Sequence, residues 1–388
     1  MKICLAAVYD ITDSRSWSGT PYSLYRTLRE TGNEITTLNL SDDHTTAAIR
    51  KNMLKHLDWR QTLRSGTPVS KLGFAEMNPL NSSILHAHCR KEEYDVLLEF
   101  GGFLPGKNLP PYYIYSDSSH DLSLDFYRQQ GRLPFNYQDS DLEKVRRAAE
   151  FVRPIYQNAQ GVFCMSGWMA QSMIHTTGVP AERVHTVYAG ANWHGQEVGE
   201  GRKKRHLTDP AEIHMLLTGK TYRGKGIDLA VEATEILNNG TGVRYHLHVC
   251  GIPDDYPHGE YVHNHGFVGK DVLTQLLKQC DLFVLPSRFD CFGIAFVEAM
   301  AYGLPCVGRK ICAMPEIIDE GENGELITGD NPADLAEKIL SICSDPEKYA
   351  RYSASAVQKA KMFTWENTTQ KILQVMREDG VGAPRGIQ

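Results

Sequence analysis

The chain has 388 residues, of which 41% are hydrophobic and 23% are charged, and its formal net charge is −6 at pH 7. This length is enough for two ordinary domains, and the composition is typical of a globular protein. The negative balance argues against a nucleic-acid binder. The nine cysteines stand singly, with no CxxC pair. An odd number of isolated cysteines favours reduced thiols and a cytoplasmic location.

Near the N-terminus, Met1–Thr12 contains one Lys and a short apolar run. The pattern indicates a first strand and not a signal peptide. No apolar stretch reaches the length that spans a bilayer. The segment Ile49–Arg64 is basic and amphipathic. It favours a core-facing helix with a solvated basic face, and weak peripheral membrane contact is the alternative.

Short apolar runs alternate with helical segments, which predicts parallel α/β sheets. Six strands are expected in the first half, at Ile3–Val8, Glu34–Leu38, Val96–Phe100, Tyr112–Tyr115, Gly161–Cys164 and Val184–Tyr188. Five are expected in the second half, at His214–Thr218, Tyr245–Cys250, Leu282–Leu285, Cys306–Gly308 and Glu325–Ile327. A polar, glycine-containing and basic stretch separates the halves. We therefore expect a first domain at residues 1–193, a linker at 194–210 and a second domain at 211–362.

In the first domain, two loops follow expected strands. The sequence WSGTPY places Gly19 before a helix, where a glycine permits close approach to a phosphate, although a plain turn would look the same. The sequence YYIYSDSSHD places Asp117 and His120 after a strand. Ligands of open α/β sheets bind at that end, so either side chain could contact a hydroxyl group, while loop capping is the plain alternative.

In the second domain, the sequence TGKTYRGKGID runs from a strand into a helix. It carries Lys220, Arg223 and Lys225, whose charges suit a diphosphate, although such a loop on its own is more often a solvated surface.

The next strand, Leu282–Leu285, leads into PSRFDCFGIAFVE. Gly293 precedes a helix that begins at about Ile294, and a helix start at the carboxyl end of a strand is an anion site. Asp290 and Phe292 lie in the loop, and Glu298 lies one turn into the helix, where a carboxylate could accept hydrogen bonds from a ribose. A carboxylate that complements the helix dipole would explain Glu298 weakly and Asp290 not at all.

The run Pro286-Ser287, Asp290, Glu298 and Ala299–Pro305 resembles the signature of the retaining glycosyltransferases of family 4, which have the GT-B fold. The segments Gly161–Asn192 and Lys361–Glu366 are also similar to stretches of that family. The departure is Asp290, where the family usually has Glu.

The resemblance implies two Rossmann-like domains that face a deep cleft, and a C-terminal helix within residues 363–388 that returns to the first domain. It implies transfer of a hexose from a UDP- or GDP-sugar to the hydroxyl of a glycan, lipid-linked or small-molecule acceptor, without a metal or other cofactor. A phosphorylase of the same fold and a non-catalytic sugar-nucleotide binder are the alternatives.

The resemblance also implies roles for individual residues. Glu298 would contact the ribose, and Lys225 with Arg223 or Lys220 would hold the diphosphate. Asp290, Phe292, Gly293 and Ile294 would surround the sugar. Gly19 would face the donor phosphate, and Asp117 or His120 would lie near the donor sugar and the acceptor.

Overall fold

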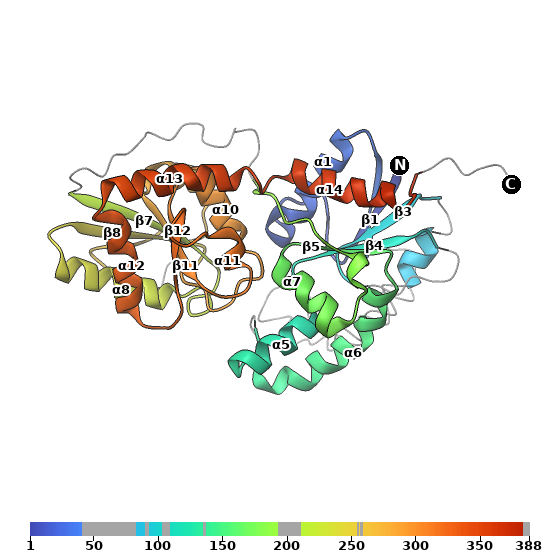
Figure 1. The fold of residues 1–388 in the computed structure, drawn as a ribbon, viewed down its shortest axis with the longest axis horizontal. Coiled ribbons are helices and arrows are strands. Elements are labelled where there is room, and N and C mark those ends of the chain that lie inside the picture. Colours follow the sequence, from blue (N-terminus) through green and yellow to red (C-terminus); the bar gives the residue numbers. More distant parts are fainter. Residues whose placement is uncertain are drawn as a thin grey trace. The chain divides into compact units, whose positions relative to one another are not determined.

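A computed structural model describes residues 1–40, 83–89, 93–102, 109–134, 137–192, 211–253, 256 and 259–382 (Figure 1). The expected linker at 194–210 and the amphipathic segment Ile49–Arg64 lie outside the described residues. The chain divides into two compact units, each with its own sheet. The first unit is Met1–Tyr188 together with Trp365–Gln388, and the second unit is Ala189–Thr364.

The first unit contains a parallel sheet in the order β2-β1-β3-β4-β5-β6. The strands are β1 Lys2–Ala7, β2 Glu34–Asn39, β3 Val96–Glu99, β4 Tyr112–Ser116, β5 Gly161–Cys164 and β6 Val184–Thr186. The main helices are α1 Thr20–Glu30, α5 His120–Gln130, α6 Leu142–Asn158, α7 Gly167–Ser172 and α14 Trp365–Glu378. The strands β3, β4 and β5 are fully buried, as strands covered on both faces must be.

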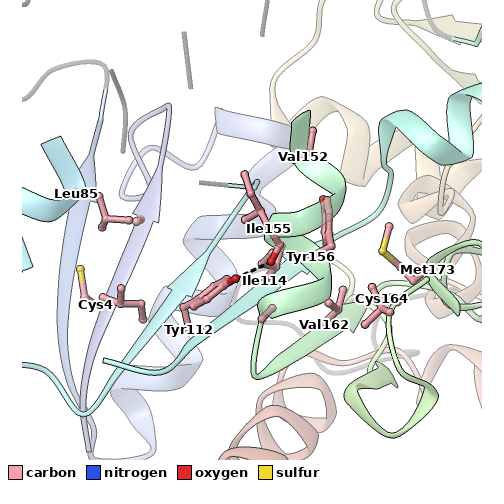
Figure 2. Packing of buried hydrophobic residues seen from close by; sticks show 14 of the residues in the cluster. Cys4, Leu85, Tyr112, Ile114, Val152, Ile155, Tyr156, Val162, Cys164 and Met173 are labelled. Carbon is pink, nitrogen blue, oxygen red and sulfur yellow. Dashed lines mark hydrogen bonds between the residues drawn. The ribbon is translucent and has the colours of Figure 1, made fainter. Parts of the chain in front are cut away.

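Apolar side chains from the sheet and from α6 form the core of the first unit (Figure 2). Tyr112 extends from β4 toward α6, where its hydroxyl donates to the carbonyl of Ile155 at 2.6 Å. This hydrogen bond satisfies the only polar atom of a tyrosine side chain that is otherwise packed in the core, so burial of the ring costs little.

The last helix, α14, belongs to the first unit, as the resemblance implies. It lies beside α1 (Figure 1), and the hydroxyls of Thr27 and Thr369 are 2.7 Å apart in the interface. The hydroxyl of Tyr113 donates to Asp379 just beyond the helix. The chain therefore closes the first unit with a segment that is far away in sequence, since Thr27 and Thr369 are 342 positions apart.

The second unit contains a parallel sheet in the order β12-β11-β10-β7-β8-β9. The strands are β7 Glu212–Thr218, β8 Arg244–Cys250, β9 Val262–Asn264, β10 Leu282–Leu285, β11 Cys306–Arg309 and β12 Gly324–Ile327. The helices are α8 Ile227–Gly240, α9 Lys270–Gln279, α10 Ile294–Ala301, α11 Met314–Ile317, α12 Pro332–Cys343 and α13 Pro346–Ala360. The two-sheet α/β architecture is confirmed.

Each of the eleven expected strands is present, and the structure adds β9. Sequence analysis missed this strand because it has only three residues, two of them polar, Val262, His263 and Asn264. So short a strand has no detectable alternation, and it is ordered by pairing along the edge of β8.

Candidate functional site

The candidate site of the second unit lies at the carboxyl edge of its sheet, where β7 and β10 are neighbours. The loop after β7 leads into α8, and the loop after β10 leads into α10. Since the strands are parallel, both loops emerge at the same edge, which is where open α/β sheets bind ligands.

An ion pair joins these two loops. The ammonium of Lys225 lies 2.6 Å from Oδ2 of Asp290, and both side chains are largely buried. The other carboxylate oxygen of Asp290 accepts the amide of Gly293 at 3.1 Å. Gly293 has a φ of 82° and caps α10, a conformation that disfavours other residues. The ion pair and the cap therefore fix a cation beside the start of a helix.

At the start of α8, the backbone amides are already hydrogen-bonded to the loop that precedes the helix. The amides of Lys225, Gly226 and Ile227 donate to loop carbonyls at 3.0–3.1 Å. Gly226 also has a φ of 69°, and a Cβ there would lie 2.4 Å from the carbonyl oxygen of Pro286. The loop is thus packed closely against the end of β10. An anion at this edge is therefore expected at the start of α10, where the first helical amides have no acceptor within the helix.

The other two predicted cations differ from Lys225. Lys220 is exposed, and the Arg223 side chain is 88% exposed, with Nε 3.8 Å from Asp228. The structure instead reveals Arg288, which is largely buried and donates to Asp228 at 2.8 Å and to the carbonyl of Arg223 at 2.6 Å. Arg288 holds the two loops together. Sequence reasoning missed it because a single Arg in a loop carries no signal of burial.

Glu298 lies one turn into α10, as expected. Burial raises the pKa of its carboxyl to about 7, and the amide of Asn192, which donates to Oε1 at 3.3 Å, acts in the opposite direction. Phe292 packs edge-on against Phe363, with ring centroids 5.9 Å apart. The Phe292 ring is therefore part of the core of the second unit, and it anchors the loop between β10 and α10.

In the first unit, the loop after β1 has an unusual backbone. Trp17, Ser18 and Gly19 have φ values of 40°, 57° and 85° in succession. Positive φ is costly for Trp and Ser, and such strain often accompanies function. The Trp17 ring contacts Phe100 and Tyr115 at centroid distances of 6.2 and 6.4 Å, which holds the loop against the sheet ends.

Asp117 follows β4 at the same edge of the first sheet, and His120 begins α5. The Asp117 charge adds to burial in raising the pKa of Tyr115 and of Tyr9. Burial lowers the pKa of His120, so its imidazole is neutral at pH 7 and able both to donate and to accept a hydrogen bond. The structure thus places Gly19, Asp117 and His120 at the carboxyl edge of the first sheet.

Within the described ranges, no three His, Cys, Asp or Glu side chains are arranged to hold a metal ion. None of the helices described is both long and apolar enough to cross a membrane. All nine cysteines, each of which lies in a described range, are free thiols.

Comparisons with known proteins agree with this geometry. The family model described as glycosyl transferases group 1 matches residues 200–359. The chain is 29% identical over 238 residues to D-inositol 3-phosphate glycosyltransferase 1 of Catenulispora acidiphila, covering 55% of this chain and 57% of that protein. It is 27% identical over 228 residues to an uncharacterized glycosyltransferase of Methanocaldococcus jannaschii, covering 57% and 60%. The chain therefore spans less than two thirds of the length of these relatives.

Solved structures match over nearly the whole chain. Sucrose-phosphate synthase from Thermosynechococcus elongatus aligns with a TM-score of 0.74 at 15% identity, covering 99% of this chain and 100% of that one. WaaG, a glycosyltransferase involved in lipopolysaccharide biosynthesis, aligns with a TM-score of 0.67 at 14% identity, covering 98% and 100%. The fold is therefore GT-B. Residues 200–359, which contain most of the second unit, resemble the glycosyl transferase group 1 family.

Proposed function

We propose that this protein is a retaining glycosyltransferase that transfers a hexose from a UDP- or GDP-sugar to an acceptor hydroxyl. The observation that carries the proposal is the Lys225–Asp290 ion pair at the carboxyl edge of the second sheet, beside the start of α10. The family match over residues 200–359 covers the same region. A partly buried cation beside the start of a helix suits a departing diphosphate.

In this proposal the donor rearranges the ion pair. The diphosphate competes with Asp290 for the ammonium of Lys225, and Asp290, still held by the amide of Gly293, turns its released oxygen to the sugar. Glu298 accepts hydrogen bonds from the ribose. The bond from the anomeric carbon to the diphosphate oxygen breaks as the acceptor oxygen bonds to the same face, within an ion-pair-like state. The proton of the acceptor hydroxyl passes to the departing diphosphate oxygen. Roles for Arg223, Lys220, Gly19, Asp117 and His120 stay predictions from the resemblance.

The acceptor is proposed to be a glycan, a lipid-linked sugar or a small molecule, and the site of action the cytoplasm, where nine free thiols would stay reduced. The reaction is proposed to need no metal, since Lys225 supplies positive charge at the leaving group.

The test is a screen of UDP-, GDP- and ADP-sugars, first by thermal unfolding and then by product analysis. A ligand at a hundredfold excess over its dissociation constant stabilises the folded state by about 2.7 kcal/mol. We expect one nucleotide class to stabilise the protein, and the product to keep the anomeric configuration of the donor in proton NMR. Formation of sugar 1-phosphate from a glycoside and phosphate would indicate a phosphorylase. Binding of a nucleotide sugar without turnover, across all acceptor types, would indicate a non-catalytic binder.

A further inference from the structure

The first unit has a cavity of about 300 Å³ away from the loops discussed above. It lies between α5 and the helix α7 with its continuation, η3 Met173–Thr177. Figure 1 shows α5 and α7 as neighbouring helices of the first unit. We call this cavity the α5–α7 groove. Its lining forms two helical stripes, one on α5 from Leu122 to Gln129 and one from Trp168 to Thr176. Volumes of about 300–1,000 Å³ are usual for small-ligand sites.

Hydrogen bonds between α5 and the α7–η3 segment join the two sides of the groove. Oδ2 of Asp125 accepts from the hydroxyl of Ser172 at 3.0 Å and from the hydroxyl of Thr176 at 2.6 Å. Thr176 lies in η3, a single turn of π-helix that follows α7 and ends at Gly178. Such turns are rare and often occur at functional sites. The turn sets His175 and Thr176 on the groove side.

The rim and walls have the chemistry of saccharide recognition. Two aromatic residues line the groove. Phe126 is only 3% exposed and has the Arg132 guanidinium over its ring, so the partly exposed Trp168 supplies the accessible aromatic surface. Aromatic faces pack against the apolar faces of sugar rings. The exposed amides of Gln129 and Gln171 and the imidazole of His175, which is 3.0 Å from Oε1 of Gln171, can donate to and accept from hydroxyls. The lining contains a carboxylate, Asp125, but no Lys or Arg, and Arg128 pairs with Asp125 from outside the lining. The charge of the carboxylate is thus balanced, and no cation lines the groove to bind a phosphate, so the lining favours a neutral, hydroxyl-rich ligand.

The groove begins close to the carboxyl edge of the first sheet, where α5 and α7 start. Leu122 is the third residue of α5, which starts at His120, and Trp168 is the second residue of α7. Both lie within about one turn of the carboxyl edge that holds Asp117. From Trp168 to His175 the groove extends along the helix for roughly 10 Å, at about 1.5 Å per residue. That length suits one or two sugar rings.

We propose that the α5–α7 groove binds a neutral sugar unit, and that this unit belongs to an oligosaccharide or glycoside acceptor whose reacting hydroxyl lies at the Asp117 edge. The inference that the groove binds a saccharide is drawn from its lining alone. The inference that this saccharide is part of the acceptor rests on the proposed function.

The test measures saccharide binding without a donor. Saturation-transfer NMR with maltose, cellobiose, lactose and sucrose is recorded on the full chain, and a dissociation constant is titrated for each binder. The double variant Gln129→Ala/Gln171→Ala removes two exposed groove amides, so it is expected to fold. Gln130→Ala, an exposed residue of α5 outside the lining, is the matched control. We expect at least one disaccharide to bind, with affinity about tenfold weaker in the double variant and unchanged in the control.

A further variant separates the groove from the donor site. Lys225→Ala should keep disaccharide binding, since Lys225 belongs to the second unit. Three results overturn the proposal: no saturation transfer to any of the four disaccharides, equal binding by the double variant and the control, or loss of binding in Lys225→Ala. If the groove binds but no nucleotide sugar is turned over, the proposed function fails and saccharide binding stands.

Discussion

In the proposed donor site, Lys225 is the residue that we expect to matter most, because its ammonium pairs with Asp290 beside the start of α10. We predict that Lys225→Ala lowers kcat by roughly 10²–10³, since charge that grows on the leaving group loses its counter-charge. The free energy of unfolding should fall by only about 1 kcal/mol, because the ion pair with Asp290 is partly solvated.

Steady-state kinetics and chemical unfolding measure both quantities, with Lys220→Ala and Arg223→Ala as comparisons. Both of these side chains are exposed, so we expect smaller losses. A larger loss of kcat in Lys220→Ala than in Lys225→Ala would contradict this prediction and would indicate that the diphosphate binds at the Lys220 end of the loop.

If Glu298 contacts the ribose as proposed, we expect donor binding to depend on pH. With the pKa of its carboxyl raised to about 7 by burial, the group is mainly protonated at pH 6 and mainly ionised at pH 8. An ionised carboxylate is the stronger acceptor for ribose hydroxyls. We predict that the affinity for an intact nucleotide sugar is about tenfold lower at pH 6 than at pH 8.

Isothermal titration calorimetry across this range measures the effect. Glu298→Gln keeps the shape of the side chain but cannot ionise, so its affinity should be lower and nearly constant with pH. Equal affinity of the wild-type protein at pH 6 and pH 8 would show that Glu298 does not contact the ribose.

At the scale of elements, the loop between β7 and α8 depends on a glycine. Gly226 has a positive φ, and a Cβ there would meet the carbonyl oxygen of Pro286. We predict that Gly226→Ala lowers the free energy of unfolding by roughly 2–4 kcal/mol, from backbone strain and overlap together. Gly240→Ala at the other end of α8 is the control, since a Cβ there meets nothing within 4 Å. Equal denaturation midpoints for the two variants would contradict the close packing of this loop.

The strands β7, β8 and β9, with the residue that follows β9, carry an unexpected group of five histidines. We call them the histidine ladder: His214, His246, His248, His263 and His265. Stacked or tilted rings lie 5.0–5.3 Å apart. His248 bridges two neighbours, with 2.9 Å from Nε2 to Nδ1 of His214 and 2.9 Å from Nδ1 to Nε2 of His265. The alternation of His246 with His248, and of His263 with His265, is the sequence signal that could have revealed a shared face.

In the folded protein, four imidazoles of the histidine ladder are held in their neutral form. Burial, with the neighbouring histidines, lowers the pKa of His248 to about 3, and burial lowers the pKa of His246, His263 and His265. Nε2 of His246 is buried without a hydrogen-bond partner in the described part of the chain, so a proton there would gain no acceptor.

We predict that acid weakens the second unit through this ladder. In the unfolded chain a histidine binds a proton near pH 6.5, whereas the folded protein resists it. The free energy of unfolding is therefore highest above pH 6.5 and falls as the pH drops toward the folded pKa values. His248→Asn should flatten this slope between pH 7 and 5, by on the order of 1 kcal/mol in a partly solvated group. Urea unfolding of both proteins across that range measures the slopes, and parallel slopes would contradict the prediction.

At the scale of the whole molecule, each unit has its own core and α14 belongs to the first. The helix buries Trp365, Thr368, Thr369, Ile372, Leu373 and Met376. Removal of so much buried surface costs several kcal/mol, a large part of the stability of an ordinary domain. We predict that a chain ending at Thr364 loses the unfolding transition of the first unit and keeps that of the second.

Differential scanning calorimetry with and without the donor nucleotide measures this outcome. The remaining transition should still move to higher temperature with nucleotide, because Lys225, Asp290 and Glu298 all lie in the second unit. Loss of both transitions together would show that the units unfold as one.

The sequence by itself determined the architecture, and it predicted the position of the proposed donor site. Fully buried strands such as Leu282–Leu285 are short apolar runs, and a glycine before an apolar helical segment marks the strand-to-helix loop at Gly293. These features are local, so they can be read without knowledge of distant contacts. The spacing of Asp290 and Glu298 is likewise a local property, and together with the residues around it this spacing is enough to indicate the family.

Tertiary structure alone decided which of the local candidates meet. The sequence offers three cations in one loop, Lys220, Arg223 and Lys225, and the structure pairs Lys225 with Asp290, because β10 lies next to β7 in the sheet. Arg288, the histidine ladder and the α5–α7 groove each depend on neighbours from other strands or helices. Their existence follows from strand order and helix packing, which long-range burial selects and no short stretch of sequence contains.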